Sequence, residues 1–335
     1  MSKLIIPANY QSMLSVYETQ IAIGTIKSVF QTNLERELKV KRASAPLFVG
    51  ADTGLNDGLN GVERPVEFEI KETGGKAQIV HSLAKWKRLA LHTYGFPVGE
   101  GLYTDMNAVR RDEEMDNLHS IYVDQWDWEK VIDRSSRNEG TLRSTVSAIV
   151  NAVCDTLDTV KESFPILGTE FERDVYFVTS QELEDQYPTL SPKERENACT
   201  KEHKTVFIMQ IGDELRSGNK HDGRAPDYDD WTLNGDILLW SDVLSCAVEI
   251  SSMGIRVDEA ALDRQLSKAN ANHSRSLPFH KMLLAGELPL TMGGGIGQSR
   301  LCLLMLEKAH IGEVQVSLWD KATLAGCEAA GIKLL

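Results

Sequence analysis

The chain has 335 residues, of which 42% are hydrophobic and 25% are charged, and this is the composition of one large globular domain or two small ones. Such a composition excludes a disordered chain, a collagen and a coiled coil. Because 49 Asp and Glu residues face 36 Lys and Arg residues, the formal net charge is -13, and the surface disfavours nucleic acid and anionic membranes.

The apolar runs fall well short of the ~18 residues of a membrane span, so we expect no membrane contact. The cysteines are far apart and lack the spacing of zinc sites or redox motifs: Cys154, Cys199, Cys246, Cys302 and Cys327. We therefore expect reduced thiols and a cytoplasmic protein.

Hydrophobic periodicity and turn residues predict the secondary structure. In chain order, the predicted elements are a helix at about 14–38, an extended run at 45–49, a hairpin at 66–70 and 77–81, a helix at 83–94, strands at 101–110 and 119–128, a helix at 141–163, a strand at 175–179, a helix beginning at the capping box 191–194, strands at 206–211, 236–240 and 244–250, helices at 258–268, 278–286 and 298–308, and a strand at 314–318. Strands joined by short turns, with helices grouped between them, predict an α+β fold with a mainly antiparallel sheet flanked by helices.

Two loops and one proline qualify this outline. Residues 51–62 concentrate Gly, Asn and Asp without periodicity, which predicts a mobile loop and a candidate lid. Residues 111–117 form the charged tip of a long hairpin. Pro46 cannot donate a backbone hydrogen bond, so we place its extended run at a strand edge or a break.

A glycine run precedes the helix that carries Arg300 in its first turn: Gly293, Gly294, Gly295 and Gly297. Glycines let a backbone approach a ligand closely, and a helix start favours an anion. The run lacks the lysine of a P-loop and the spacing of a dinucleotide fingerprint. The alternative is a flexible turn packed against a strand, but the closeness of Arg300 favours nucleotide contact.

Arg110 ends a predicted strand and precedes the charged hairpin tip. Its guanidinium could hold a phosphate with two parallel hydrogen bonds, and the alternative is a solvated arginine paired with Asp112 or Glu113. Considered together with Arg300 and the glycines, Arg110 is better explained as a phosphate ligand.

The strand at 119–128 is dense in polar and aromatic residues. Gln125 and Asp127 share one face, while Trp126 and Trp128 share the other. The first face could form a polar floor for an amino acid. The strand could equally be a solvent-facing edge whose tryptophans cover the core.

Asp236 and Glu249 lie in apolar strands, where an unpaired carboxylate would be costly. Magnesium carrying a polyphosphate would satisfy both carboxylates, and arginines such as Arg256 are the alternative partners. The acidic loop at 221–231 is most simply solvated, although it could share a cation with Asp236.

The helix at 83–94 carries a basic group, Lys85, Lys87 and Arg88. One of the three could meet a phosphate or carboxylate, and we expect solvent around the others. His81 and Ser82 precede this helix, but no third residue of a hydrolytic triad is identifiable.

Six segments together carry a resemblance to a known family. They are HSLAKWKR at 81–88, GEGLYT at 99–104, YVDQWDWE at 122–129, RAPDYDDW at 224–231, SSMGIR at 251–256 and the glycine run at 293–297. In this order they resemble the ammonia-dependent asparagine synthetase family, aspartate-ammonia ligase, over nearly the whole chain.

The resemblance implies one catalytic domain over residues 1–335, similar to that of class II aminoacyl-tRNA synthetases. It implies a homodimer without a tRNA-binding domain, in which the first helix and strand, about 1–50, form the dimerisation element. The implied substrates are L-aspartate, ATP and ammonia, with Mg²⁺ as the cofactor.

The resemblance also implies residue roles. Arg110 would hold the α-phosphate, and Arg300 with Gly294, Gly295 and Gly297 would contact the nucleotide. Asp236 and Glu249 would bind magnesium. The implied substrate-binding residues are Ser82, Lys87, Gln125, Asp127, Asp229 and Ser252.

The expected chemistry joins the β-carboxylate of aspartate to AMP and expels pyrophosphate, because an ionised carboxylate resists attack by an amine. Ammonia then attacks the mixed anhydride. Ammonia is mainly ammonium at neutral pH, so an acidic side chain that accepts its proton would help, and we assign Asp57 to this role.

Two alternatives belong to other functional classes. The chain could be a truncated aspartyl- or asparaginyl-tRNA synthetase paralogue that loads RNA, but its net charge of -13 opposes this. It could also be a regulatory dimer that binds amino acid or nucleotide without turnover.

Overall fold

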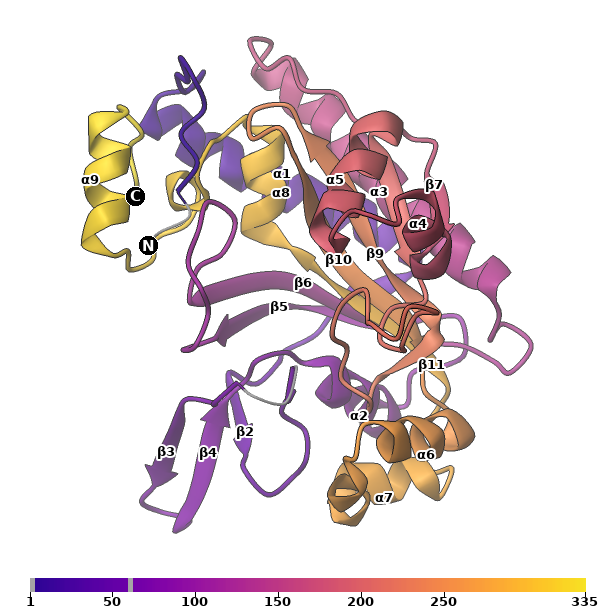
Figure 1. Cartoon of the computed structure of the whole chain (residues 1–335). Coiled ribbons are helices and arrows are strands. Elements are labelled where there is room, and N and C mark those ends of the chain that lie inside the picture. The colour runs from indigo at the N-terminus through magenta and orange to yellow at the C-terminus, as the bar shows by residue number, and fades with distance from the viewer. Residues whose placement is uncertain (1–3, 60–62) are drawn as a thin grey trace.

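The centre of the structure is an eight-stranded sheet with the strand order β1-β5-β6-β11-β10-β9-β8-β7 (Figure 1). In this computed structural model, which describes residues 4–59 and 63–335, the strands pair antiparallel except at the two edges, where β1 pairs with β5 and β7 with β8 in parallel. The strands are β1 (Val40–Arg42), β5 (Gly101–Val109), β6 (Tyr122–Val131), β7 (Tyr176–Thr179), β8 (Thr205–Met209), β9 (Asp229–Ser241), β10 (Cys246–Arg256) and β11 (Thr291–Gly297). The predicted α+β class with a mainly antiparallel sheet is confirmed.

Helices surround this sheet and cover both of its faces (Figure 1). They are α1 (Val16–Leu38), α2 (Ala84–Tyr94), α3 (Glu139–Ser163), α4 (Ser180–Gln186), α5 (Pro192–His203), α6 (Glu259–Lys268), α7 (Pro278–Leu284), α8 (Gln298–Met305) and α9 (Lys321–Ala329), with 3₁₀ turns at Asn272–Ser276 and Ile311–Glu313. None of the helices described is long and apolar enough to cross a membrane.

The long first helix packs with α3 against one face of the sheet, and it begins where the sequence indicates. Ser15 accepts a hydrogen bond from the backbone N–H of Glu18, whose side chain accepts one in return, so a capping box fixes the start of α1. Phe30 is fully buried, and its ring lies 4.5 Å from that of Trp126 on β6. The tryptophan face of β6 therefore belongs to the core, which leaves Gln125 and Asp127 on the opposite face.

A smaller sheet stands apart from the large one, with the order β2-β4-β3 (Figure 1). Its strands are β2 (Phe48–Gly50), β3 (Glu67–Ile70) and β4 (Gly75–Ile79). The predicted hairpin is thereby confirmed, and Pro46 precedes an edge strand as expected. The loop predicted at 51–62 is irregular through residue 59, and its last three residues lie outside the described part of the chain.

The structure adds one strand and overturns one predicted element. The glycine run, for which a flexible turn was the alternative to nucleotide contact, is the strand β11, which pairs with both β6 and β10 in the middle of the sheet. Residues 314–318 are not a strand, because the buried Gln315 side chain bonds to Asp124 and Ser299 and the backbone stays irregular before α9. The sequence reasoning also missed β1, α4 and α9.

Candidate active site

A pocket of about 380 Å³ opens on the face of the large sheet opposite α1. Most of the residues singled out in the sequence line it: Asp57, Ser82, Arg110, Gln125, Asp127, Asp229, Glu249, Ser252, Gly294, Gly295, Gly297 and Arg300. Lys87 and Asp236 do not line the pocket themselves. Each binds a residue that does, Lys87 to Asp127 and Asp236 to Arg224. Segments far apart in sequence thus meet at one place.

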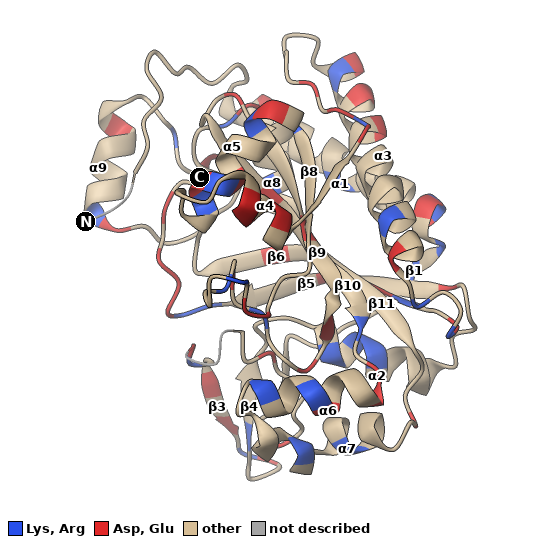
Figure 2. Cartoon of the chain, turned by 45° about the vertical axis from the view of Figure 1, so that its right-hand side comes forward, with Lys and Arg blue, Asp and Glu red and all other residues tan. Residues whose placement is uncertain are grey.

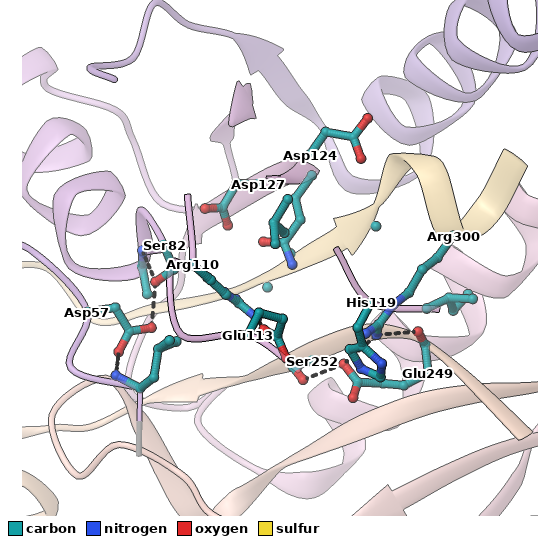
Figure 3. Close-up of a pocket in the computed structure, with 18 of the residues that line it drawn as sticks. Asp57, Ser82, Arg110, Glu113, His119, Asp124, Asp127, Glu249, Ser252 and Arg300 are labelled. Atoms are coloured by element: carbon teal, nitrogen blue, oxygen red, sulfur yellow. Dashed lines mark hydrogen bonds and ion pairs between the residues drawn. The ribbon is translucent and has the colours of Figure 1, made fainter. Parts of the chain in front are cut away.

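Arg110 and Arg300 extend into this pocket from different elements (Figure 3). Arg110 follows β5, and its backbone N–H donates to the carbonyl of Ile121, so it closes the β5–β6 hairpin. Its Nη1 lies 3.9 Å from Glu113, and its buried Nε has no hydrogen-bond partner among the described residues. Arg300 donates to the backbone carbonyl of Glu249 at 2.9 Å. Both guanidiniums keep donors available for an anion.

The glycines of β11 are needed because polar side chains lie directly across this strand. A Cβ at Gly293 would overlap the side chains of Glu129 and Arg256, and one at Gly295 would overlap Gln125. The glycines therefore permit close approach, as expected, but the group they admit at these positions is a side chain of the protein. Gly297 caps α8, whose first turn carries the arginine.

A buried network of charges lies beneath the pocket floor. Lys87 binds Asp127 and donates to the carbonyls of Trp128 at 2.9 Å and Gly294 at 3.1 Å. Glu129 is fully buried and lies 3.8 Å from Lys87. These contacts fix the side chain of Asp127 on the floor of the pocket.

Arg256 completes this network. Its Nε and Nη2 donate to Glu129 at 3.0 and 2.7 Å, and its Nη1 binds Asp229. Burial acts to raise the pKa of Glu129, but Arg256 and Lys87 outweigh it and the pKa is lowered. For Asp229 burial prevails and the pKa is raised. Arg256 thus pairs with these two acids, and not with Asp236 or Glu249.

The expectation that most of the basic group on α2 is solvated is wrong, since Lys85, Lys87 and Arg88 are all buried. Figure 2 shows the basic residues of α2 beneath the ends of β10 and β11. Lys85 binds Asp227 at 2.8 Å, and Arg88 donates to the backbone carbonyl of Val257 at 2.7 Å. The helix therefore directs its cations inward, where each one fixes another segment of the site.

The acidic loop expected to be solvated is also mostly internal. Asp227, Asp229 and Asp230 are buried, and Asp230 binds Arg137. Because each carboxylate has a cationic partner, the loop is held against the body of the protein.

Asp57 lies at one end of the pocket, away from Glu249 and Arg300 (Figure 3). It accepts hydrogen bonds from the Ser82 hydroxyl at 2.7 Å and from the Leu59 N–H at 2.8 Å. The Nδ1 of His81, which precedes Ser82, contacts the backbone carbonyl of Asp57 at 3.0 Å. Asp57 is thus a carboxylate that is 4% exposed and has only neutral partners among the described residues.

Asp236 and Glu249 lie on the neighbouring strands β9 and β10. Asp236 binds Arg224 at 2.6 Å, and Glu249 accepts from the Ser252 hydroxyl at 3.0 Å. Burial raises the pKa of Asp236 to about 7, and the Glu249 carboxylate adds to this rise while Arg224 opposes it. Asp236 is buried, whereas the side chain of Glu249 is 36% exposed and lines the pocket. Two neighbouring carboxylates that repel each other at the edge of a pocket fit a bound cation.

Sequence reasoning did not single out every residue of the site. Glu129, Arg224 and Tyr228 were quoted only as parts of motifs, and Arg256 only as a partner for other acids. A signal was present for Glu129 and Arg256, because a charged residue inside a strand that enters the core needs a partner.

The fold is that of the class II aminoacyl-tRNA synthetases. The asparaginyl-tRNA synthetase of Pyrococcus horikoshii, complexed with asparaginyl-adenylate, matches with a TM-score of 0.65 and 14% identity, over 91% of this chain and 70% of the synthetase. The asparaginyl-tRNA synthetase of Entamoeba histolytica, also with asparaginyl-adenylate, matches with a TM-score of 0.63 and 12% identity, over 90% of this chain and 66% of that one. The chain thus spans about two thirds of these synthetases.

The family model for aspartate-ammonia ligase matches residues 17–331. The aspartate–ammonia ligase of Clostridium tetani is 57% identical over 334 residues, covering 99% of this chain and 98% of the relative. That of Ruminiclostridium cellulolyticum is 56% identical over 336 residues, covering all of both chains. The chain belongs to the aspartate-ammonia ligase family, as its motifs indicate.

Proposed function

We propose that this protein forms L-asparagine from L-aspartate and ammonia with ATP, through a β-aspartyl-adenylate, and releases AMP and pyrophosphate. Family membership supports the formation of the amide, and the synthetase-like fold supports the use of ATP. The observation that carries the mechanism is the convergence of Arg110 and Arg300 on one pocket above the Lys87, Asp127 and Arg256 network.

The first step activates the substrate carboxylate. A β-carboxylate oxygen attacks the α-phosphorus of ATP and forms an O–P bond, while the bond to the pyrophosphate oxygen breaks and its electron pair leaves with pyrophosphate. Phosphoryl and nucleotidyl transfer depend mainly on positioning and charge neutralisation. Arg110 at the α-phosphate and Arg300 against the nucleotide supply both, and no protein nucleophile takes part.

The floor of the pocket holds the amino acid. Gln125 makes no side-chain hydrogen bond within the described residues, so its amide is free to bind the substrate. Asp127 and Asp229 keep fixed positions through Lys87 and Arg256, and they receive the substrate ammonium. Such preorganised polar groups orient the β-carboxylate towards the nucleotide.

Amide formation uses Asp57, with Ser82 as its orienting partner. The ammonium ion gives one proton to the carboxylate of Asp57, and the freed electron pair forms the C–N bond to the β-carbonyl carbon. The C–O bond to the phosphate breaks, and its electron pair leaves with AMP. The protonated amide nitrogen then loses a second proton to water.

Asp236 and Glu249 would hold Mg²⁺, because Mg²⁺ typically takes one or two carboxylates and fills its other positions with phosphate oxygens and water. No group of three or more metal-ligating side chains is present between residues 4–59 or 63–335, so phosphates would supply the remaining ligands. When bound, the ion neutralises the charge that develops on the leaving pyrophosphate.

We also propose that the chain forms a single catalytic domain and that two copies form a homodimer. Residues 1–50 would provide the main contact between the two copies. Val16, Tyr17 and Ile21 are exposed on α1, and Tyr17 is 76% exposed, although large apolar side chains on a helix are usually covered. Next to this helix, β1 forms an edge of the large sheet. Changing Tyr17 to Glu should shift the mass measured by light scattering from dimer to monomer.

The two alternative functions are less well supported. Relatives of nearly the same length carry the ligase name, and the net charge of -13 opposes RNA binding. The available donors of Arg110 and Arg300 support turnover more than regulatory binding. We also propose a cytoplasmic location, since the reaction uses ATP and the five cysteines are free thiols.

The direct test measures asparagine, AMP and pyrophosphate with purified protein, aspartate, ATP, Mg²⁺ and ammonium. We expect all three products in equal amounts, and turnover that ignores ammonium would contradict the proposal. Charging of bulk tRNA would favour the synthetase alternative.

The role of Asp57 has its own test. Asp57→Asn keeps the size of the side chain and its contacts with Ser82 and Leu59, but it removes the proton acceptor. We expect aspartate-dependent exchange of pyrophosphate into ATP to survive better than asparagine formation. Equal loss of both activities would show that Asp57 binds aspartate or ATP instead.

A further inference from the structure

Tyr228 lies in the wall of the pocket, on a backbone that is fixed on both sides. Before it, Asp227 binds Lys85 at 2.8 Å and His280 at 2.9 Å. The carbonyl of Tyr228 itself accepts from the backbone N–H of Val257 at 2.8 Å. After it, Gln265 donates to the carbonyl of Asp229 at 2.9 Å. The side chain therefore projects from a rigid segment.

The hydroxyl of Tyr228 is nevertheless free. It has no hydrogen-bond partner among the described residues, although tyrosine hydroxyls in largely buried places are usually paired. The ring is held from the other side, because Cζ of Arg256 lies 5.7 Å from its centroid. A fixed ring with an unpaired hydroxyl in a pocket is arranged to bind a ligand.

The surroundings of this hydroxyl are negative. Burial raises the pKa of Tyr228 well above its usual value, and the Asp57 carboxylate raises it further, although Arg224 opposes this. The hydroxyl is therefore protonated at neutral pH, and Tyr228 and Asp57 both line the pocket. The two buried cations of the floor, Lys87 and Arg256, are already bound to other carboxylates. This end of the pocket thus favours a small cation that brings its own donors.

We propose that Tyr228 is a second ligand of the incoming ammonium ion, with its hydroxyl oxygen accepting an N–H hydrogen bond while Asp57 binds and deprotonates the ion. Ammonium has four N–H donors and loses its water shell on entering the pocket, so one carboxylate alone would leave donors unpaired. Tyr228 keeps its own proton throughout, and Asp57 takes the proton as described above. The inference rests on the proposed function and assigns its ammonium-binding residue.

This role predicts a difference between two nitrogen nucleophiles. Hydroxylamine is mainly uncharged at neutral pH, so it can attack the same adenylate without being captured as a cation or deprotonated first. A residue that binds ammonium should matter little for hydroxamate formation. A residue that positions aspartate or the adenylate should matter equally for both nucleophiles.

Tyr228→Phe removes only the hydroxyl. We expect the ammonium concentration for half-maximal rate to rise about tenfold, which is the scale of a hydrogen bond to a charged group. We expect pyrophosphate exchange with aspartate and ATP to stay within about twofold of wild type, and hydroxamate formation to be retained. Tyr94→Phe, at an exposed tyrosine outside the pocket, is the matched control and should change none of the three rates.

Three outcomes would overturn this inference. Unchanged ammonium dependence would show that the hydroxyl is not a ligand. Equal losses with ammonium and hydroxylamine, or a parallel loss of pyrophosphate exchange, would place Tyr228 at aspartate or in the structure of the pocket. A failure of the proposed function is distinct from these, because wild-type protein would then form no asparagine from ammonium.

Discussion

Arg64 is bound to Asp112, which lines the pocket. The backbone N–H of Arg64 and its Nε both donate to Oδ2 of Asp112 at 3.0 Å, and Nη2 binds Oδ1. In the sequence, Arg64 follows Asp57 by seven residues and Asp112 follows Arg110 by two. The pair therefore connects the segment that follows Asp57, which we propose to bind ammonium, with the segment that follows Arg110, which we propose to bind the α-phosphate.

Breaking this pair with Arg64→Ala should loosen the Asp57 segment without unfolding the protein, because exposed ion pairs contribute little to stability. Water would then reach the adenylate more often. We expect the ratio of asparagine to AMP to fall below one, as measured by product analysis at saturating substrates. Lys268→Ala breaks another exposed ion pair, with Asp213, and should leave the ratio unchanged.

The parts of the site that the sequence predicts are those that depend on residues close together in the chain. The faces of β6 were readable because alternation is a local property, and the packing of Phe30 on Trp126 confirms that the tryptophan face is the inner one. The inward direction of Lys85 and Arg88 was not readable, because their partners Asp227 and Val257 lie more than 100 residues away. Charged side chains on a helix look alike in sequence whether they are solvated or paired.

The glycine run was not predicted as a strand for a related reason. Consecutive glycines usually indicate a turn, yet in β11 they are required by two side chains of the neighbouring strand β6, Glu129 and Gln125, which lie across them. Tertiary crowding, which no local pattern records, decides the conformation here. The short edge strand β1 has only three residues and carried no periodic signal.

Arg110→Ala tests the phosphate assignment. Removing one preorganised donor to a developing charge typically lowers the rate about 10²- to 10³-fold, and we expect this loss in pyrophosphate exchange. Arg111→Ala removes the neighbouring exposed arginine and serves as the control. If the two variants were equally active, the role of Arg110 at the α-phosphate would be wrong.

Glu129→Gln tests the network beneath the floor. Glu129 is fully buried and neutralises Arg256 and Lys87, so its replacement leaves positive charge uncompensated in a dry environment. Breaking such a buried pair costs about 3–5 kcal/mol. We expect a loss of this size in the free energy of unfolding, measured with denaturant. Glu328→Gln, on the exposed surface of α9, should change it by less than about 0.5 kcal/mol.

His310 predicts how stability depends on pH. Its Nδ1 accepts from the N–H of Gly312 at 3.0 Å, and burial lowers its pKa from 6.5 to about 4. Unfolded chains therefore bind more protons than folded ones between these two values, so this contribution to stability is complete above pH 6.5 and is lost as the pH falls towards 4. Protonating Nδ1 also breaks the bond to Gly312.

His310→Asn keeps a side chain that can cap the 3₁₀ turn at Ile311–Glu313 but removes the titrating ring. The variant will have lower stability overall because a buried ring is lost, so the slope with pH is the informative quantity. We expect the melting temperature of the wild type to fall more steeply than that of the variant between pH 6.5 and 4. Glu313, whose pKa is raised by burial, acts in both proteins and largely cancels in the comparison. Parallel curves would show that His310 titrates in the folded state as it does in the unfolded chain.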